Sequence, residues 1–176
     1  MTKYRFLTSW HIEAPLQKVF DAVVDSLCWP AWWPGAQHVE QLEPGDAAGI
    51  GSLRRYTWKG LLPYRLSFVA CATRVEPPHL LEAVVEGDLQ GYGRWIFRHD
   101  EGVTLVHYEW DVRTTKRWMN LLAPAAHRVF AYNHHVLMQS GAEGLARHLC
   151  ARLIRVSHRE LPDSTDVHPA TGRKPL

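Results

Sequence analysis

The sequence predicts an α+β fold in which one long C-terminal helix lies on a curved antiparallel sheet. Apolar and polar residues alternate over about seven segments, which is the period of half-buried strands. Most of these segments are joined by short turns containing glycine or proline, and strands joined in this way pair antiparallel. A helical period of three and four residues follows the first strand and returns in the last third of the chain.

The N-terminal part of the chain predicts one strand and two short helices. Residues 4–13 alternate between apolar and polar side chains, and Pro15 ends this segment. Residues 16–27 carry apolar side chains at the spacing of an amphipathic helix. Pro30 and Pro34 then enclose a tryptophan cluster, where proline permits only a short helical turn. The cluster consists of Trp29, Trp32 and Trp33, and we expect it to close one end of the domain.

Six further strands are predicted in the middle of the chain. Their ranges are 37–43, 51–59, 64–76, 79–86, 89–98 and 103–113. The last range has the clearest alternation, with His107, Glu109 and Asp111 on its polar face. Successive side chains of a strand point to opposite faces of the sheet. We therefore expect Tyr108 and Trp110 to face the helix.

A long helix completes the predicted domain. From Ala125 to about Ser157 only two glycines interrupt the helical pattern, each at a cost of about 1 kcal/mol. We expect residues 1–157 to form one domain, which agrees with the length of the chain. Residues 158–176 contain few apolar side chains, and we expect them to form a polar, flexible tail.

Composition and charge exclude several classes of protein. The chain has 176 residues and a net charge of +2, and residues 1–150 contain 15 Lys/Arg against 15 Asp/Glu. A nucleic-acid-binding protein would show a basic patch, so we expect no nucleic-acid partner. No segment approaches the ~18 consecutive apolar residues of a membrane helix, so we expect no integral membrane association. The three widely spaced cysteines imply no disulfide framework and favour the cytoplasm.

The sequence contains no motif for a metal ion or another cofactor. It has eleven histidines, but no HExxH motif. His134 and His135 are adjacent and point ~100° apart on a helix, so they cannot chelate one ion. The glycine-containing segments lack the dinucleotide-binding pattern, and no GxSxG motif is present. We expect no metal and no cofactor.

Aromatic residues dominate the predicted inner face of the sheet. Those placed there by alternation are Trp10, Trp95, Phe97, Tyr108 and Trp110. Tyr56 and Trp58 share one face of their strand with Arg54, which can meet a carbonyl or carboxylate if that face is the inner one. These rings either fill the core or line a cavity. A cavity lined by rings with a few polar groups suits a planar or polycyclic apolar ligand.

The long helix carries a matching stripe of residues. They are Phe130, His134, Leu137, Met138, Gly141 and Leu145. His134 is either a histidine with a partner in the core or an acid, base or orienting donor in a pocket. Asn133 supplies an amide at the edge of the stripe. We expect Gly141 to leave room beside His134.

Several short phrases of the sequence occur in a specific order and spacing. They are Trp10 to Pro15, Trp32-Trp33-Pro34-Gly35, Trp58 to Tyr64, Gly87 to Gly91 followed by Gly93 and Trp95, Trp110 to Trp118, and Asn133-His134 with Met138. Together they resemble the polyketide cyclase/dehydrase and lipid-transport family of the START-like, helix-grip (SRPBCC) superfamily. The resemblance covers residues 3–150. It implies a helix-grip fold, in which a curved sheet of six to seven strands wraps around the C-terminal helix.

Three functions are compatible with these observations. We favour a protein that binds a hydrophobic small molecule, aromatic or polycyclic, between the sheet and the long helix. The first alternative is a polyketide cyclase or dehydratase, with His134 as the candidate catalytic residue. The second is a protein–protein interaction module with a filled cavity. The candidate ligand-binding residues are Trp10, Tyr56, Trp58, Trp95, Phe97, Tyr108, Trp110, Phe130, Asn133, His134, Leu137, Met138 and Gly141.

Overall fold

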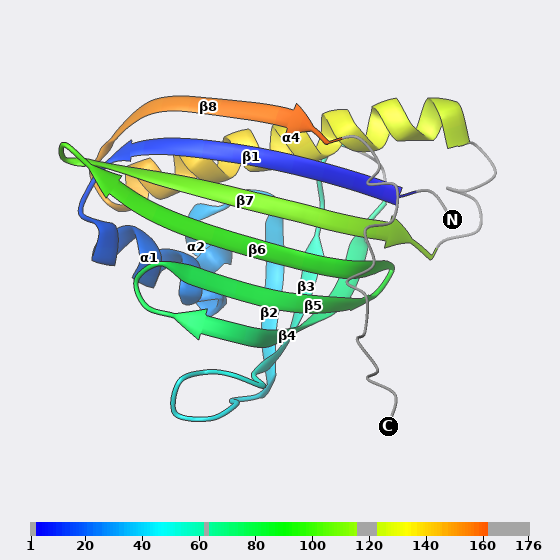
Figure 1. The fold of residues 1–176 in the computed structure, drawn as a ribbon. Coiled ribbons are helices and arrows are strands. Elements are labelled where there is room, and N and C mark those ends of the chain that lie inside the picture. Colours follow the sequence, from blue (N-terminus) through cyan, green and yellow to red (C-terminus); the bar gives the residue numbers. More distant parts are fainter. Residues whose placement is uncertain (1–2, 62–63, 116–122, 162–176) are drawn as a thin grey trace, which may run out of the picture.

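The computed structural model describes residues 3–61, 64–115 and 123–161 (Figure 1). Within these residues, eight strands form one antiparallel sheet in the order β2-β3-β4-β5-β6-β7-β1-β8. The strands are β1 Lys3–Glu13, β2 Ala36–Glu43, β3 Leu53–Trp58, β4 Leu66–Glu76, β5 Leu80–Gly87, β6 Leu89–Asp100, β7 Val103–Thr114 and β8 Arg152–Glu160. The helices are α1 Leu16–Val24, the short 3₁₀ helix η1 Ser26–Cys28, α2 Trp29–Trp32 and α4 Ala123–His148.

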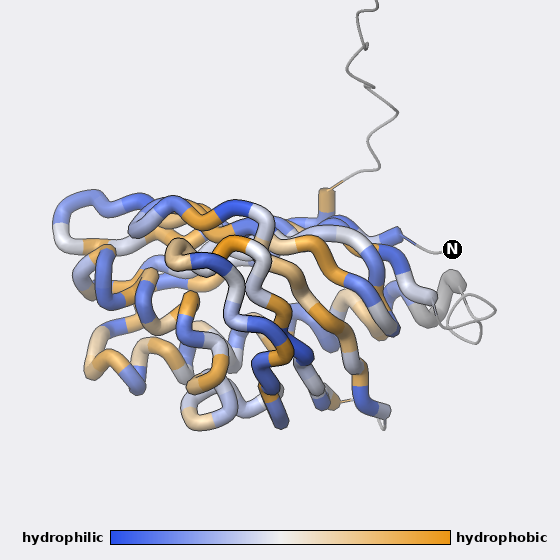
Figure 2. Tube along the Cα trace, turned by 90° about the horizontal axis from the view of Figure 1, so that it is seen from below, coloured by the Kyte–Doolittle hydropathy of each residue, from blue (hydrophilic) through white to orange (hydrophobic). Residues whose placement is uncertain are grey.

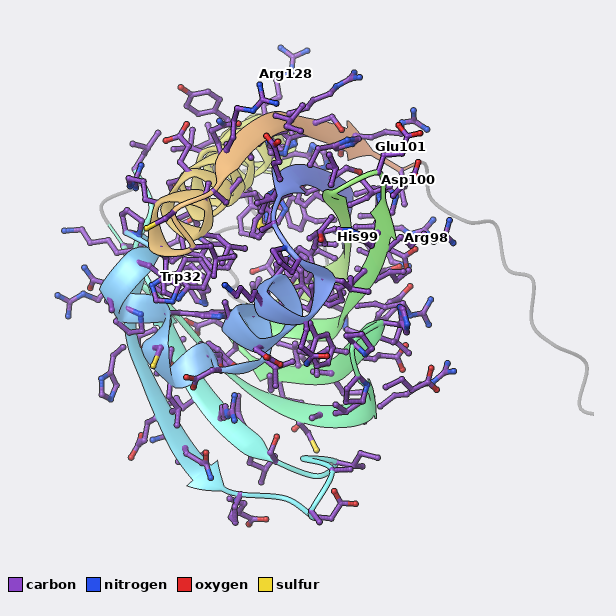
Figure 3. The ribbon with its side chains drawn as sticks, turned by 90° about the vertical axis from the view of Figure 1, so that its left-hand side faces the viewer. Trp32, Arg98, His99, Asp100, Glu101 and Arg128 are labelled. Atoms are coloured by element: carbon purple, nitrogen blue, oxygen red, sulfur yellow. The ribbon has the colours of Figure 1, made fainter. Side chains whose placement is uncertain are left out.

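The predicted α+β helix-grip fold is confirmed. The sheet curves around α4, while α1 and α2 cover one end of the sheet (Figures 1 and 3). A glycine supports the close pairing of two central strands: Gly91 of β6 has a φ of 153°, and a Cβ atom there would overlap the Asp111 carbonyl of β7. Glycine is the residue that accepts both this backbone angle and this close approach.

The C-terminal helix ends earlier than its periodicity predicts. The prediction that it continues to about Ser157 is wrong, because α4 ends at His148. Cys150 has a φ of 51°, its N–H donates to the Arg147 carbonyl, and the Ala151 N–H donates to the Ala146 carbonyl at 2.8 Å. These bonds form a Schellman motif, which terminates a helix and usually has glycine where Cys150 stands. The sequence therefore carries no visible stop signal at this point.

The chain then returns as an eighth strand, which the sequence pattern did not predict. β8 pairs antiparallel with β1, with His158 opposite Thr8 and Val156 opposite Trp10 (Figure 1). The domain boundary predicted between residues 157 and 158 falls inside this strand. The rest of the predicted flexible tail, from residue 162, lies outside the described residues.

The two faces of the sheet differ as the alternation predicts. Trp95 and Trp110 are buried on the inner face, and hydrophobic and hydrophilic residues alternate along the strands (Figure 2). On the outer face, Arg94 pairs with Glu82 at 2.7 Å and with Glu109 at 3.2 Å. The predicted inner and outer faces of β7 are therefore confirmed. Among the described helices, none is long and apolar enough to cross a bilayer.

The tryptophan cluster closes one end of the domain, as predicted. Trp33 is only 2% exposed, and its indole Nε1 donates to the Leu137 carbonyl of α4 at 2.8 Å. A Cβ atom at Gly141 would overlap the Trp33 ring, and one at Gly144 would overlap the Trp32 carbonyl. Figure 3 shows Trp32 in this position next to α4. The two glycines that interrupt the helical pattern thus let α4 approach the cluster closely.

Replacing Trp33 should therefore destabilise the whole domain. We expect Trp33→Ala to lower the free energy of unfolding by about 3–5 kcal/mol, the range for removal of a large buried aromatic side chain. Trp33→Phe keeps most of the ring volume and should cost less. Urea denaturation followed by circular dichroism measures both values. A loss below about 0.5 kcal/mol for the alanine variant, the range of ordinary surface substitutions, would contradict this role.

Candidate functional site

The structure contains a cavity between the inner face of the sheet and the helices. Its volume is about 170 Å³, and strands β3 to β7, the α1–α2 segment and α4 contribute to its wall. Ten of the predicted ligand-binding residues line it. They are Tyr56, Trp58, Trp95, Tyr108 and Trp110 on the sheet and Phe130, Asn133, His134, Leu137 and Met138 on α4.

Three predicted residues lie outside the wall of this cavity. Trp10 is 1% exposed and packs against Trp33 and Trp95 in the core. Phe97 meets Phe20 of α1 with ring centroids 5.2 Å apart. Gly141 does not leave room beside His134, because the Trp33 ring fills that space. Alternation identified the correct face for Trp10 and Phe97, but α1 and the tryptophan cluster cover the end of the sheet where these two residues lie.

Strands β4 and β5 supply a part of the wall that was not predicted from the sequence. Phe68, Ala70 and Ala72 are alternate residues of β4, and Ala83 and Val85 are alternate residues of β5. The three alanines are small, so they leave the space that larger side chains would fill. The alternation of side chains over residues 66–72 could have identified this part of the wall from the sequence. Arg54, whose orientation the sequence left open, also lines the cavity.

His134 lies in the α4 wall of the cavity in an apolar setting. It is 9% exposed, its ring stacks on Phe6 at 4.5 Å, and its Nε2 has no hydrogen-bond partner among the described residues. Burial lowers the pKa of His134 to about 3, with smaller contributions from His135 and His158. The imidazole is therefore neutral at pH 7, since a buried ring disfavours the charged form.

Asn133, next to His134, has a structural partner. Its Oδ1 accepts a hydrogen bond from the Leu61 N–H at 2.8 Å. A Cβ atom at Gly60 would overlap the Asn133 side chain, so the glycine allows this contact. Asn133 thereby holds the segment after β3 against α4, and this is its role in the wall of the cavity.

Two tyrosines add hydroxyl groups to the sheet side of the cavity. Tyr108 stacks on Trp95 with ring centroids 3.9 Å apart, and its hydroxyl makes no hydrogen bond to another described residue. Burial raises the pKa of Tyr108 well above its usual value, and the neighbouring Tyr56 adds to this effect. Burial also raises the pKa of Tyr56, whose hydroxyl lies 2.8 Å from Ser26 Oγ. Both phenols are neutral hydrogen-bonding groups at pH 7.

A metal site is not formed by the residues that the structure describes. Among them, no three His, Cys, Asp or Glu side chains come together in a way that could hold an ion. His135 and His158 stack with ring centroids 4.6 Å apart, but they lie with Thr8 outside the wall of the cavity. Apolar side chains make up most of the cavity wall, and its polar groups include Arg54, Ser26, Tyr56, Tyr108 and His134.

A curved antiparallel sheet that grips one long helix, with an aromatic cavity between them, defines the helix-grip, START-like fold. A family model described as polyketide cyclase / dehydrase and lipid transport matches residues 4–149. The chain belongs to this family. No curated protein matches the chain by sequence.

Solved structures share the fold at low sequence identity. The di-domain ARO/CYC protein BexL is 19% identical, with a TM-score of 0.65 over 85% of this chain and 51% of its own, so this chain spans about half its length. The Zhui aromatase/cyclase from a Streptomyces species is 14% identical, with a TM-score of 0.69 over 84% and 94% of the two chains. A START superfamily protein from Mycobacterium smegmatis is 11% identical, with a TM-score of 0.65 over 82% and 97%.

The low pKa of His134 should make the protein less stable in acid. The unfolded chain binds this proton near pH 6.5, whereas the folded state binds it only near pH 3. Stability from this group is therefore complete above pH 6.5 and is lost as the pH falls towards 3. Between pH 7.5 and 5.0 we expect His134 to account for a loss of about 2 kcal/mol.

Urea denaturation of wild type and His134→Leu at the two pH values measures this contribution. The variant should lose about 2 kcal/mol less than wild type over this interval. His38→Leu, which removes an exposed imidazole from β2, is the matched control and should follow wild type. Parallel pH dependence in wild type and His134→Leu would show that His134 is solvated rather than buried.

Proposed function

We propose that this protein binds a hydrophobic small molecule with an aromatic or polycyclic skeleton in the cavity between the sheet and α4. The composition of the wall carries this proposal: rings and small aliphatic side chains dominate it, and polar groups are few. Ligand pockets have this composition, because apolar contact supplies affinity and a few polar groups orient the ligand. An apolar cavity of ~150 Å³ admits benzene. A volume of about 170 Å³ is therefore enough for an aromatic ring.

A cyclase or dehydratase reaction is the second candidate function. Two solved structures with this fold have descriptions that name such a reaction. BexL is described as an ARO/CYC protein, and Zhui is described as an aromatase/cyclase. Proton transfer is most efficient when the pKa of the catalytic group lies near the working pH. The pKa of about 3 leaves His134 a poor acid and a poor base at pH 7. The unpaired Nε2 of His134 and the hydroxyl of Tyr108 better suit orientation of a bound molecule, which favours the binding function.

The third candidate function, a protein–protein interaction module, has less support. It would fit a domain whose side chains fill the space between sheet and helix. Instead, the cavity remains between the inner face and α4, and its wall includes the small side chains of Ala70, Ala72 and Ala83. We also propose that the protein works in the cytoplasm, because Cys28 and Cys150 are exposed, free thiols.

Filling the cavity should abolish ligand binding. The probe is 2-naphthalenemethanol, a neutral bicyclic alcohol, titrated into the protein in a calorimeter. Wild type should bind it, and Ala70→Phe should bind at least about tenfold more weakly, because losing the burial of even two methylene groups has this effect. Val69→Phe adds the same ring next along β4, at a position opposite Arg55 on the outer face, and should bind like wild type.

Native mass spectrometry of the freshly purified protein provides an independent test. We expect a hydrophobic compound to co-purify with wild type and to be missing from Ala70→Phe. If this compound is a substrate and His134 is catalytic despite its low pKa, His134→Asn should stop its turnover and leave its affinity nearly intact. If it is only carried, the same change should alter affinity alone. Failure of wild type both to carry a compound and to bind the naphthalene probe would contradict the proposed function.

A further inference from the structure

One wall of the cavity contains a positive charge that meets no carboxylate of the residues described by the structure. Arg54 lies on β3 and lines the cavity. Its Nη1 donates to the Val24 carbonyl at 2.7 Å and to Ser26 Oγ at 2.8 Å. Its Nε is buried without a hydrogen-bond partner. The guanidinium also lies beside the Tyr56 hydroxyl, and its charge and hydrogen bonding lower the Tyr56 pKa against the larger effect of burial.

The neighbouring arginine on the same strand differs sharply. Arg55 points to the outer face, is 46% exposed, and pairs with Glu40 at 2.7 Å. Arg54 is half-buried and forms no ion pair within the described part of the chain. Removing a charge from water is costly unless it is paired. Because side chains alternate along β3, Arg55 lies on the outer face, where water already stabilises its charge and the ion pair contributes little. Arg54 lies on the inner face without an ion pair to a described residue.

The protein itself compensates only part of this charge. Val24 is the last residue of α1, and the carbonyl end of a helix carries a partial negative charge of about half a unit. Ser26 is a neutral partner. The described residues supply no carboxylate that would compensate the rest of this charge.

We propose that Arg54, Ser26 and Tyr56 bind the carboxylate of the ligand, so that the protein selects hydrophobic acids over neutral hydrocarbons. This inference rests on the proposed function, and it names the chemical class of the ligand. Nε and Nη2 form the edge of the guanidinium that does not face Val24 and Ser26, and within the described residues this edge meets no carboxylate. Two N–H groups on one edge match the two oxygens of a carboxylate.

Tyr56 can supply a further donor to the same group. Ser26 Oγ accepts from Arg54 Nη1 and lies 2.8 Å from the Tyr56 hydroxyl. When the Ser26 O–H donates to the Tyr56 oxygen, the Tyr56 O–H is free to donate to a ligand. Beyond this group, the rings of Trp29, Trp58 and Phe68 continue the wall. The site therefore combines a place for an acid with an apolar surface for the skeleton that carries it.

Two probes of the same shape test this proposal. They are 2-naphthoate and 2-naphthalenemethanol, titrated separately by calorimetry at pH 7.5. We expect wild type to bind naphthoate about ten- to a hundredfold more tightly than the alcohol, the range that hydrogen bonds to a charged group provide. Arg54→Gln should remove this preference by weakening naphthoate binding alone. Arg54→Lys keeps the charge but loses the planar edge, so it should retain only part of the preference.

The matched control is Arg55→Gln, which removes an arginine from the outer face of the same strand. It should leave both affinities unchanged. Equal affinity of wild type for the two probes would overturn the carboxylate site while the proposed function stands. The same conclusion follows if Arg54→Gln weakens both probes equally. If wild type binds neither probe, the carboxylate site is overturned, and the proposed function is overturned as well if no compound co-purifies with wild type. The wild-type comparison alone remains decisive even if Arg54→Gln does not fold.

Discussion

The contact between the Trp33 indole and α4 is the constraint on which the cavity depends. The ring occupies the space over Gly141 and donates to the Leu137 carbonyl, so the helix is anchored at one end of the sheet. Because the bulky Trp33 ring lies between α4 and the sheet at this end, the helix can rest on the curved sheet without filling the space over the centre of the sheet. The wall at that centre includes small side chains, among them Ala70, Ala72 and Ala83. The cavity follows from this geometry rather than from poor packing.

The polar groups of the cavity are selective because nearly all of them are neutral. Burial keeps the His134 imidazole and the Tyr108 phenol uncharged at pH 7. Arg54 is the exception, and the α1 carbonyl end and Ser26 hold its guanidinium in place. A ligand therefore meets an apolar wall with neutral hydrogen-bonding groups and one cation. This pattern suits an apolar skeleton with a single acidic group better than a highly polar metabolite.

Membership in the polyketide cyclase / dehydrase and lipid transport family accounts for the fold. BexL, Zhui and the mycobacterial START protein, from 11% to 19% identical, share the architecture and leave the reaction open, because one fold hosts different chemistries. The polar chemistry of the cavity comes from the side chains that this chain places in its wall. The pKa of His134 and the unpaired Arg54 are properties of these side chains, and they favour binding of an acid over proton transfer.

The sequence by itself determined the strands from β1 to β7, the inner and outer faces of most of them, and most of the aromatic and α4 residues of the cavity, but not β8. It could do so because alternation and the helical period are local properties of a short segment and can be read without knowledge of the fold. Only the tertiary structure decided that Trp10 and Phe97 are covered by neighbouring helices, that Trp33 fills the space at Gly141, and that Arg54 has no ion-pair partner among the described residues. It also decided the end of α4, because Cys150 adopts a backbone angle that glycine usually provides. Each of these features depends on which segments, distant in the sequence, come into contact in the fold. The periodicity of a segment gives no information about such contacts.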